Sequence, residues 1–128
     1  MELSRPMRGL LLACGPMNVV GAISFAPPFP DGRRMIGLAE PPAFYLWVLS
    51  AWILAFGAAF AHQGWTGRAN RAVLALAAWG KGVFAALLIG GAAMGELPPL
   101  AIAGGAPDAA LAAVFAVWLW RTREGSSG

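Results

Sequence analysis

The sequence predicts an all-α fold, an integral membrane four-helix transmembrane bundle with both termini in the cytoplasm. Charged residues make up 12% of the chain and hydrophobic residues 59%, whereas soluble domains carry about 25% charged residues. Four apolar stretches are long enough to cross a bilayer, and most arginines fall on one side of the four crossings. The 128 residues fit one such domain over residues 1–124, followed by a flexible tail or cloning remnant at 125–128.

The four candidate spans are residues 7–26, 43–61, 72–94 and 99–120. A helix rises about 1.5 Å per residue, so about 20 residues cross the hydrocarbon core. The first span follows arginines as a signal peptide would, but Pro16 and Asn18 interrupt it and no Ala-x-Ala cleavage pattern ends it. We therefore expect this span to be retained as a membrane anchor.

Two connections between the spans are informative. Prolines bracket residues 27–42, where the apolar Met35, Ile36 and Leu38 stand beside arginines. That segment is either a short element lying on the outer membrane surface or an ordinary periplasmic loop. The short link at residues 95–99 predicts that the third and fourth helices form a hairpin.

Arginine placement predicts the orientation. One side of the four crossings carries most of these residues: Arg5, Arg8, Arg68, Arg71, Arg121 and Arg123. Arg33 and Arg34 fall on the other side, and basic residues favour the cytoplasmic face. The net charge of +3 mostly reflects this bias, so we expect the arginines to meet lipid phosphates and expect no nucleic-acid partner.

Polar side chains inside the spans predict the functional site. Counted from the cytoplasmic ends, one such residue on each helix lies roughly 15 to 19 Å deep, near the midplane of a bilayer. Charges are costly there, and Lys81 and Asp108 both lie on faces of small residues, so we expect them to pair directly. With two aromatic neighbours, the polar residues form the predicted ligand-binding or coupling site: Asn18, Ser50, Trp52, Trp79, Lys81 and Asp108. The charged pair serves either to fix helix packing or to bind a ligand, a proton or a partner subunit.

The fourth helix contains residues that weaken it. Pro107 disfavours helical geometry at the residue before it, and Gly104 and Gly105 lower the helix propensity of the same turn. We expect a break there, with Asp108 capping the second half, because broken membrane helices are typical of binding sites.

Other reactive residues are sparse. Cys14 is the only cysteine, which excludes an intrachain disulfide and a multi-cysteine metal site, and His62 is the only histidine. The sequence contains no paired carboxylates, serine–histidine set or glycine-rich phosphate loop. We therefore expect no catalytic residue, metal or cofactor, and a binding protein rather than an enzyme.

Several short motifs follow one another along residues 14–123: Asn18 with Gly21, Gly37-Leu38, Pro41-Pro42, Gly80-Lys81, Gly95-Glu-Leu-Pro98 and Asp108. In this order they resemble small bacterial four-helix inner-membrane proteins of the DoxX-like type. The resemblance implies a multi-pass protein of the bacterial inner membrane and an association with membrane redox or quinone chemistry.

Three functions compete on these observations. The first is a non-catalytic membrane protein that binds a hydrophobic small molecule such as a quinone or lipid, or serves as an accessory subunit of a membrane redox complex. The second is a small proton-coupled secondary transporter that uses Lys81 and Asp108 as its coupling site. The third is an intramembrane enzyme, such as a lipid isomerase using Asp108, which has the least support. The expected partners are the lipid bilayer and a hydrophobic ligand or membrane subunit, with a homo-oligomer left open.

Overall fold

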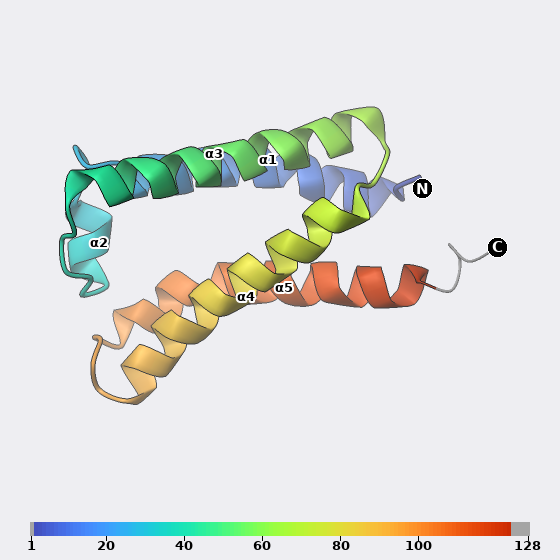
Figure 1. The fold of residues 1–128 in the computed structure, drawn as a ribbon. Coiled ribbons are helices and arrows are strands. Elements are labelled where there is room, and N and C mark those ends of the chain that lie inside the picture. Colours follow the sequence, from blue (N-terminus) through green and yellow to red (C-terminus); the bar gives the residue numbers. More distant parts are fainter. Residues whose placement is uncertain (1, 124–128) are drawn as a thin grey trace. The chain divides into compact units, whose positions relative to one another are not determined.

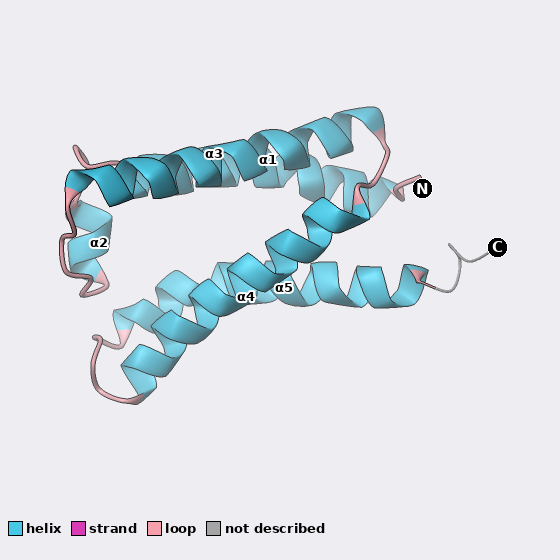
Figure 2. Cartoon of the chain, viewed as in Figure 1, coloured by secondary structure: helices cyan, strands magenta, loops and turns pink. Residues whose placement is uncertain are grey.

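A computed structural model describes residues 2–123 and is helical throughout its regular structure (Figures 1 and 2). The elements, in chain order, are α1 (Arg5–Phe25), α2 (Asp31–Met35), α3 (Ala43–Thr66), α4 (Arg71–Ala93) and α5 (Leu100–Thr122). Within the described range no strand forms, and an isolated bridge between Glu2 and Arg68 is the sole β-type pairing. The all-α class is therefore confirmed.

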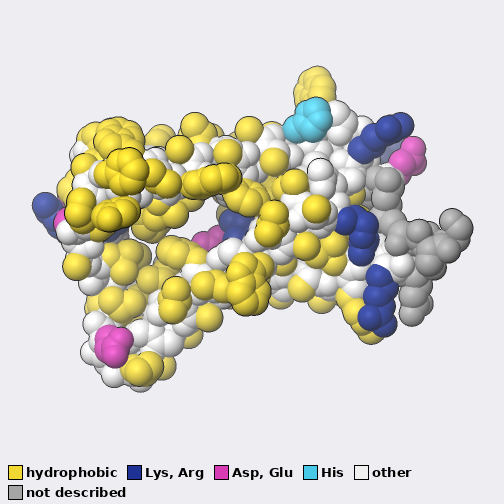
Figure 3. Space-filling view, in the orientation of Figure 1, with side chains coloured by type: hydrophobic (Ala, Val, Ile, Leu, Met, Phe, Trp, Pro, Cys, Tyr) yellow, Lys and Arg dark blue, Asp and Glu magenta, His cyan; other side chains and the backbone are white. Residues whose placement is uncertain are grey.

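The helices α1, α3, α4 and α5 are long and apolar enough to cross a membrane, with 21, 24, 23 and 23 residues. The four predicted spans are therefore confirmed as long apolar helices, which suit a multi-pass membrane protein. Hydrophobic side chains cover most of the helix surface visible in Figure 3, while most lysine and arginine side chains lie near helix ends. Such a distribution suits apolar surroundings along the helices and polar surroundings at their ends.

The chain divides into two compact units. The first, here the N-terminal unit, extends to Arg34 and resumes over Ala39–Asn70, so it contains α1 and α3. The second, the C-terminal unit, contains Met35–Leu38 and the chain from Arg71 onward, with α4 and α5. In each unit the two long helices run antiparallel (Figure 1).

Glycines bring α1 and α3 close together in the N-terminal unit. A Cβ atom placed on Gly64 would lie 2.7 Å from Cγ of Leu12 and 3.0 Å from the carbonyl oxygen of Arg8. A Cβ on Gly57 would lie 2.7 Å from Cβ of Asn18. Both distances are too short for any larger residue, so the absence of a side chain sets the spacing of these helices.

Small residues also bring α4 and α5 together in the C-terminal unit. A Cβ atom on Gly105 would lie 3.3 Å from both Cα and the carbonyl oxygen of Ala85. Leu74 on α4 and Phe115 on α5 are fully buried. The unit is therefore tightly packed at the turn next to Lys81 and Asp108.

The turn after α4 explains the hairpin predicted at residues 95–99. Gly95 has a φ of +80°, which glycine adopts without strain. The amide of Glu96 donates to the carbonyl of Gly91 at 2.9 Å, and that of Gly95 to Ala92 at 3.2 Å, which is a Schellman ending. The side chain of Leu97 then covers Gly91, where an added Cβ would lie 2.7 Å away.

Arginine side chains complete two other helix ends. The last carbonyl groups of a helix lack intrahelical donors and carry partial negative charge. Arg8 donates from Nε to Gly64 and from Nη2 to Trp65, both at 3.1 Å, at the end of α3. Arg71 donates to the carbonyl of Leu119 at 2.9 Å at the end of α5. Each unit thus carries its own capping group.

The predicted break in the fourth helix is wrong, because α5 runs unbroken from Leu100 to Thr122 with Pro107 inside it. A proline removes one backbone donor from a helix, while a full break would release several more polar groups at once. In an apolar medium each released group costs several kcal/mol, roughly, unless it finds a partner. The continuous helix is therefore the cheaper arrangement, and Asp108 caps no half-helix.

The segment between α1 and α3 contains the five-residue helix α2 followed by a packed stretch. Gly37, with a φ of +80°, lies against the ring of Pro98, and a Cβ there would lie 2.4 Å from Cδ of that proline. Ile36 contacts Gly104, where an added Cβ would lie 3.3 Å from its Cγ2. Met35–Leu38 therefore pack within the C-terminal unit, and their position at a membrane surface stays a prediction.

Candidate functional site

Lys81 and Asp108 form an ion pair within the C-terminal unit. The Nζ atom of Lys81 lies 2.8 Å from Oδ1 of Asp108, which is both a hydrogen bond and a salt bridge. Lys81 lies near the middle of α4 and Asp108 near the middle of α5. The predicted direct contact is thus confirmed, while its role stays a prediction.

Helix periodicity explains why these two residues meet. On α4, Lys81 falls at the centre of a stripe of buried residues spaced three or four apart: Leu74, Ala77, Ala85 and Leu88. On α5, Asp108 falls between Gly105 and Phe115 on the corresponding stripe. Because the helices run antiparallel, the close contact of Ala85 with Gly105 sets the two charged residues opposite each other one turn away.

The pair is only partly enclosed. The side chains of Lys81 and Asp108 are 15% and 25% exposed. Oδ1 of Asp108 accepts the bond from Lys81, whereas Oδ2 accepts no hydrogen bond from any residue within 2–123. Over the same residues no buried side-chain nitrogen or oxygen lacks a partner, so Oδ2 lies at the surface of the unit. A carboxylate oxygen is therefore open in the middle of an apolar helix.

Asn18 and Ser50 are committed to contacts between α1 and α3. The side-chain amide of Asn18, a buried residue, donates to the carbonyl of Ile53 at 2.9 Å. The hydroxyl of Ser50 donates to the carbonyl of Ala22 at 2.7 Å, one of the last carbonyls of α1. Such bonds hold membrane helices together at roughly 0.6 to 2 kcal/mol each. Both residues thus act in packing the N-terminal unit.

The six predicted site residues divide between the two units. Asn18, Ser50 and Trp52 belong to the N-terminal unit, and Trp79, Lys81 and Asp108 to the C-terminal unit. The structure brings Lys81 and Asp108 into contact. Trp52 and Trp79 are 63% and 73% exposed, so neither is enclosed by the polar groups of its own unit. A shared depth of the polar residues in a membrane stays a prediction.

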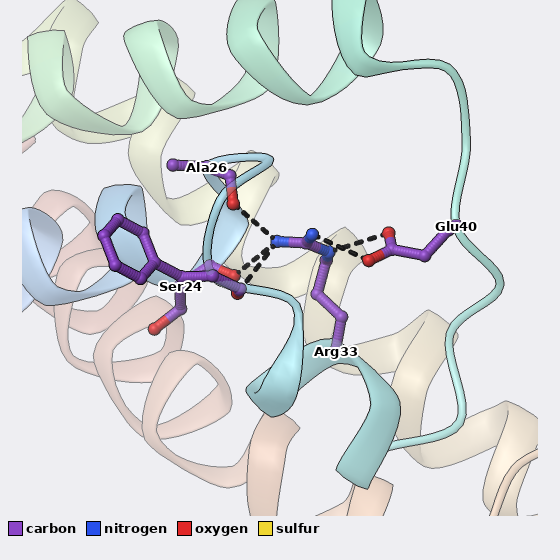
Figure 4. Close-up of polar contacts among 5 residues, drawn as sticks. Ser24, Ala26, Arg33 and Glu40 are labelled. Atoms are coloured by element: carbon purple, nitrogen blue, oxygen red, sulfur yellow. Dashed lines mark hydrogen bonds and ion pairs between the residues drawn. The ribbon is translucent and has the colours of Figure 1, made fainter.

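Sequence reasoning missed a second charged cluster around Arg33, shown in Figure 4. The guanidinium of Arg33 donates to both carboxylate oxygens of Glu40, from Nη2 at 2.8 Å and from Nε at 3.0 Å. Its Nη1 donates to the carbonyl groups of Ser24, Ala26 and Phe29, at 2.8, 3.0 and 3.2 Å. We call this arrangement the Arg33 clasp, and it leaves the Arg33 side chain only 3% exposed.

The sequence contained a weak signal for the Arg33 clasp. Arg33 lies beside Arg34 outside the predicted spans, and a glutamate follows it seven residues later between two sets of prolines. The prolines keep the segment from continuing as helix, so its carbonyl groups need another donor. An arginine suits that need because its five N–H groups point in different directions within one plane.

Glu40 lies outside the membrane-spanning helices, and its contact with Arg33 alters its ionisation. The hydrogen bond from Arg33 lowers the pKa of the Glu40 carboxyl below its usual value and outweighs the opposing effect of desolvation. The positive charges of Arg33 and Arg34 act in the same direction. The carboxylate form is therefore favoured over a wider pH range than in an isolated glutamate.

Within residues 2–123, no three His, Cys, Asp or Glu side chains come close enough together to hold a metal ion. Cys14 is buried in α1. Comparison of the chain with known protein families, with curated proteins and with solved structures found no match. The Lys81–Asp108 pair is therefore the feature of the described residues from which a function can be inferred.

Proposed function

We propose that this protein is a non-catalytic membrane protein that binds a hydrophobic small molecule, a quinone or a lipid, at the Lys81–Asp108 pair. It does so alone or as an accessory subunit of a membrane redox complex. The observation that carries the proposal is the partial exposure of both charged side chains, 15% and 25%, midway along α4 and α5. A pair that served helix packing alone would gain by being fully enclosed, because charges facing acyl chains are costly.

The surroundings of the pair favour a hydrophobic ligand. The residues beside the pair on its own helix faces are apolar: Ala77, Ala85 and Leu88 on α4, and Leu111 and Phe115 on α5. Ligand sites commonly combine such apolar walls with a few polar groups that fix orientation. A molecule with an apolar body and a polar head would therefore match this part of the C-terminal unit, and it would enter from the bilayer.

The test compares the protein with a variant that lacks both charges, Lys81→Met with Asp108→Leu. Removing the two together leaves no unpaired charge, so the helices should still pack. Each protein is purified in mild detergent, its helix content is checked by circular dichroism, and bound lipids and quinones are extracted and identified by mass spectrometry. We expect a bound species in the wild-type protein that the double variant lacks. If the wild-type protein carries neither a ligand nor a partner protein, the proposal is wrong.

A second candidate is a proton-coupled transporter, favoured by the open Oδ2 atom of Asp108. Carboxylates inside membrane helices are typical of the ion and proton pathways of transporters. The test measures proton flux into vesicles for Asp108→Asn against a matched control, Glu96→Gln, whose carboxyl lies in the turn after α4. Flux that depends on Asp108 and not on Glu96 would support transport, and equal flux in both variants would exclude it for the substrates tested.

We also propose the bacterial inner membrane as the location, with both termini in the cytoplasm. In the N-terminal unit, Arg5 and Arg8 lie at the start of α1 and Arg68 follows α3, whereas two arginines lie in α2. In the C-terminal unit, basic residues lie at the start of α4 and the end of α5, and the α4–α5 turn has none. The bias supports this orientation, and the DoxX-like resemblance supports the location.

A further inference from the structure

The open oxygen of Asp108 narrows the chemistry of the ligand. Oδ1 is paired with Lys81 at 2.8 Å, and Oδ2 reaches the surface of the C-terminal unit without a donor among residues 2–123. An ionised carboxylate only accepts hydrogen bonds and has room for about four of them. The site therefore offers an acceptor to whatever molecule lies against it.

The helix that carries Asp108 has few donors to offer in return. Because α5 is continuous from Leu100 to Thr122, its interior amide groups are used within the helix, and Pro107 has no amide hydrogen. Apolar surroundings would leave Oδ2 without water, and an unsatisfied charged acceptor is costly there. A ligand that brings its own donor removes this cost.

From this geometry we infer that the site selects an apolar molecule that carries a hydroxyl group, such as a phenol, a quinol or an alcohol, over the same molecule without that hydroxyl. The inference rests on the proposed binding function and specifies its ligand class. The hydroxyl donates to Oδ2 of Asp108, and the apolar body lies against the apolar residues beside the pair. An oxidised quinone or an ester has only acceptor oxygens, so at this position it would place oxygen against oxygen.

The probes for the test are a long-chain 4-alkylphenol and its methyl ether, a 4-alkylanisole with the same chain. The two differ by the donor alone and, unlike a quinol, neither oxidises readily during the measurement. Binding to the full protein in detergent is measured by equilibrium dialysis, and the partition of each probe into protein-free micelles is subtracted. We expect the phenol to bind at least about tenfold more tightly than the ether, the range for a hydrogen bond to a charged group.

The first control is the variant with Lys81→Met and Asp108→Leu, which removes both charges and leaves neither one unpaired. The second control is Glu96→Gln, which retains the Lys81–Asp108 pair. We expect the preference for the phenol to vanish in the first and to persist in the second. Equal binding of both probes, lost in the double variant, would overturn this inference and leave the proposed function intact. A preference that persists in the double variant would show that the hydroxyl is recognised elsewhere and would also overturn it. Failure of both probes to bind the wild-type protein would count against the inference and the proposed function together.

Discussion

Arg33 shows how this chain encloses a charged side chain outside its long helices. Every nitrogen of its guanidinium group donates to an acceptor, with Glu40 on one side and carbonyl groups at and just after the end of α1 on the other. Buried charges are tolerated when they are paired and fully hydrogen-bonded. The residue thus joins the end of α1 to the chain that leads into α3.

Replacing Arg33 with methionine should destabilise the protein. Methionine keeps much of the apolar stem but leaves the carbonyl groups of Ser24, Ala26 and Phe29 without their donor. We expect a loss of roughly 2 to 4 kcal/mol in the free energy of unfolding, measured by denaturation of the detergent-solubilised protein. The matched control, Arg34→Met, changes the adjacent exposed arginine and should stay within about 0.5 kcal/mol. Equal losses in the two variants would contradict the role assigned to the Arg33 clasp.

The Arg33 clasp should also weaken in acid. Because the folded protein lowers the pKa of Glu40, the stabilisation is present above the usual glutamate pKa and is lost as the pH falls through the lowered value. Hydrogen exchange of the amides around α2, measured from neutral pH down into that acid range, should therefore show opening of this segment. In Glu40→Gln, which cannot ionise, the acid-dependent component of the exchange should disappear. A transition that persists in that variant would assign the effect to another group.

The Lys81–Asp108 pair calls for single and double replacements. Lys81→Met alone or Asp108→Leu alone strands one charge and should cost roughly 3 to 5 kcal/mol in the free energy of unfolding. The double variant should recover most of that loss, because neither charge remains. Denaturation of all four proteins, the wild type included, closes a double-mutant cycle. Additive losses would mean that the 2.8 Å contact does not couple the two residues.

The sequence predicted one of these charged contacts and missed the other for a physical reason. Lys81 and Asp108 stand out because apolar residues surround each of them, and helix periodicity then sets their faces. Arg33 and Glu40 lie in an irregular segment, where no period relates a residue to its neighbours in space. Carbonyl groups, the main partners of Arg33, are present at every position and give no signal in a sequence.

At the scale of elements, glycine sets the packing of α1 on α3. Gly64→Ala should separate these helices, because the new methyl group would lie 2.9 Å from the amide nitrogen of Leu12 and 3.0 Å from the carbonyl oxygen of Arg8. Backbone atoms give way with difficulty, so we expect a loss of roughly 1 to 3 kcal/mol in the free energy of unfolding. Gly80→Ala is the matched control, since nothing lies within 4 Å of the added atom. That variant should be neutral or more stable by up to about 1 kcal/mol, because alanine favours helix.

Local sequence predicted some elements of this fold correctly, whereas others depend on the surroundings of the helix. The four spans and the turn at Gly95 followed from apolar length and from a glycine next to prolines, both of which are local. The break predicted at Pro107 was wrong because local propensity is weak beside the cost of unpaired backbone groups in an apolar medium. Propensity scales from water therefore overstate how readily such a helix breaks.

At the scale of the whole molecule, the division into two units did not follow from the sequence. Rows of small residues occur on α3, α4 and α5 alike, so they indicate close packing without naming the partner helix. In the structure the contacts that pair helices are specific: Gly64 with Leu12 in one unit, and Gly105 with Ala85 in the other. Which helices pair is therefore determined by close contacts at individual glycines, and the overall content of small residues does not determine it.

The proposed orientation is testable with a membrane-impermeant thiol reagent. Gly32→Cys and Glu2→Cys each place a thiol at an exposed position without removing an arginine, and the native Cys14 is buried. With both termini in the cytoplasm, we expect the thiol at position 32 to react in intact cells and the thiol at position 2 to react only after the membrane is disrupted. The reverse pattern would overturn the orientation, and labelling of both in intact cells would exclude a cytoplasmic N-terminus.

The residues that cap the helix ends are synthesised at different times relative to the helices they cap. Arg8 precedes α3 in the chain and Arg71 precedes α5. The arginine that caps each of these helices is therefore already synthesised when the last turn of the helix is made. For α1 the order is reversed, because Arg33 and Ser50, which satisfy its last carbonyl groups, are translated after it. Until translation passes residue 50, water or lipid head groups must therefore solvate the carbonyl groups at that end of α1.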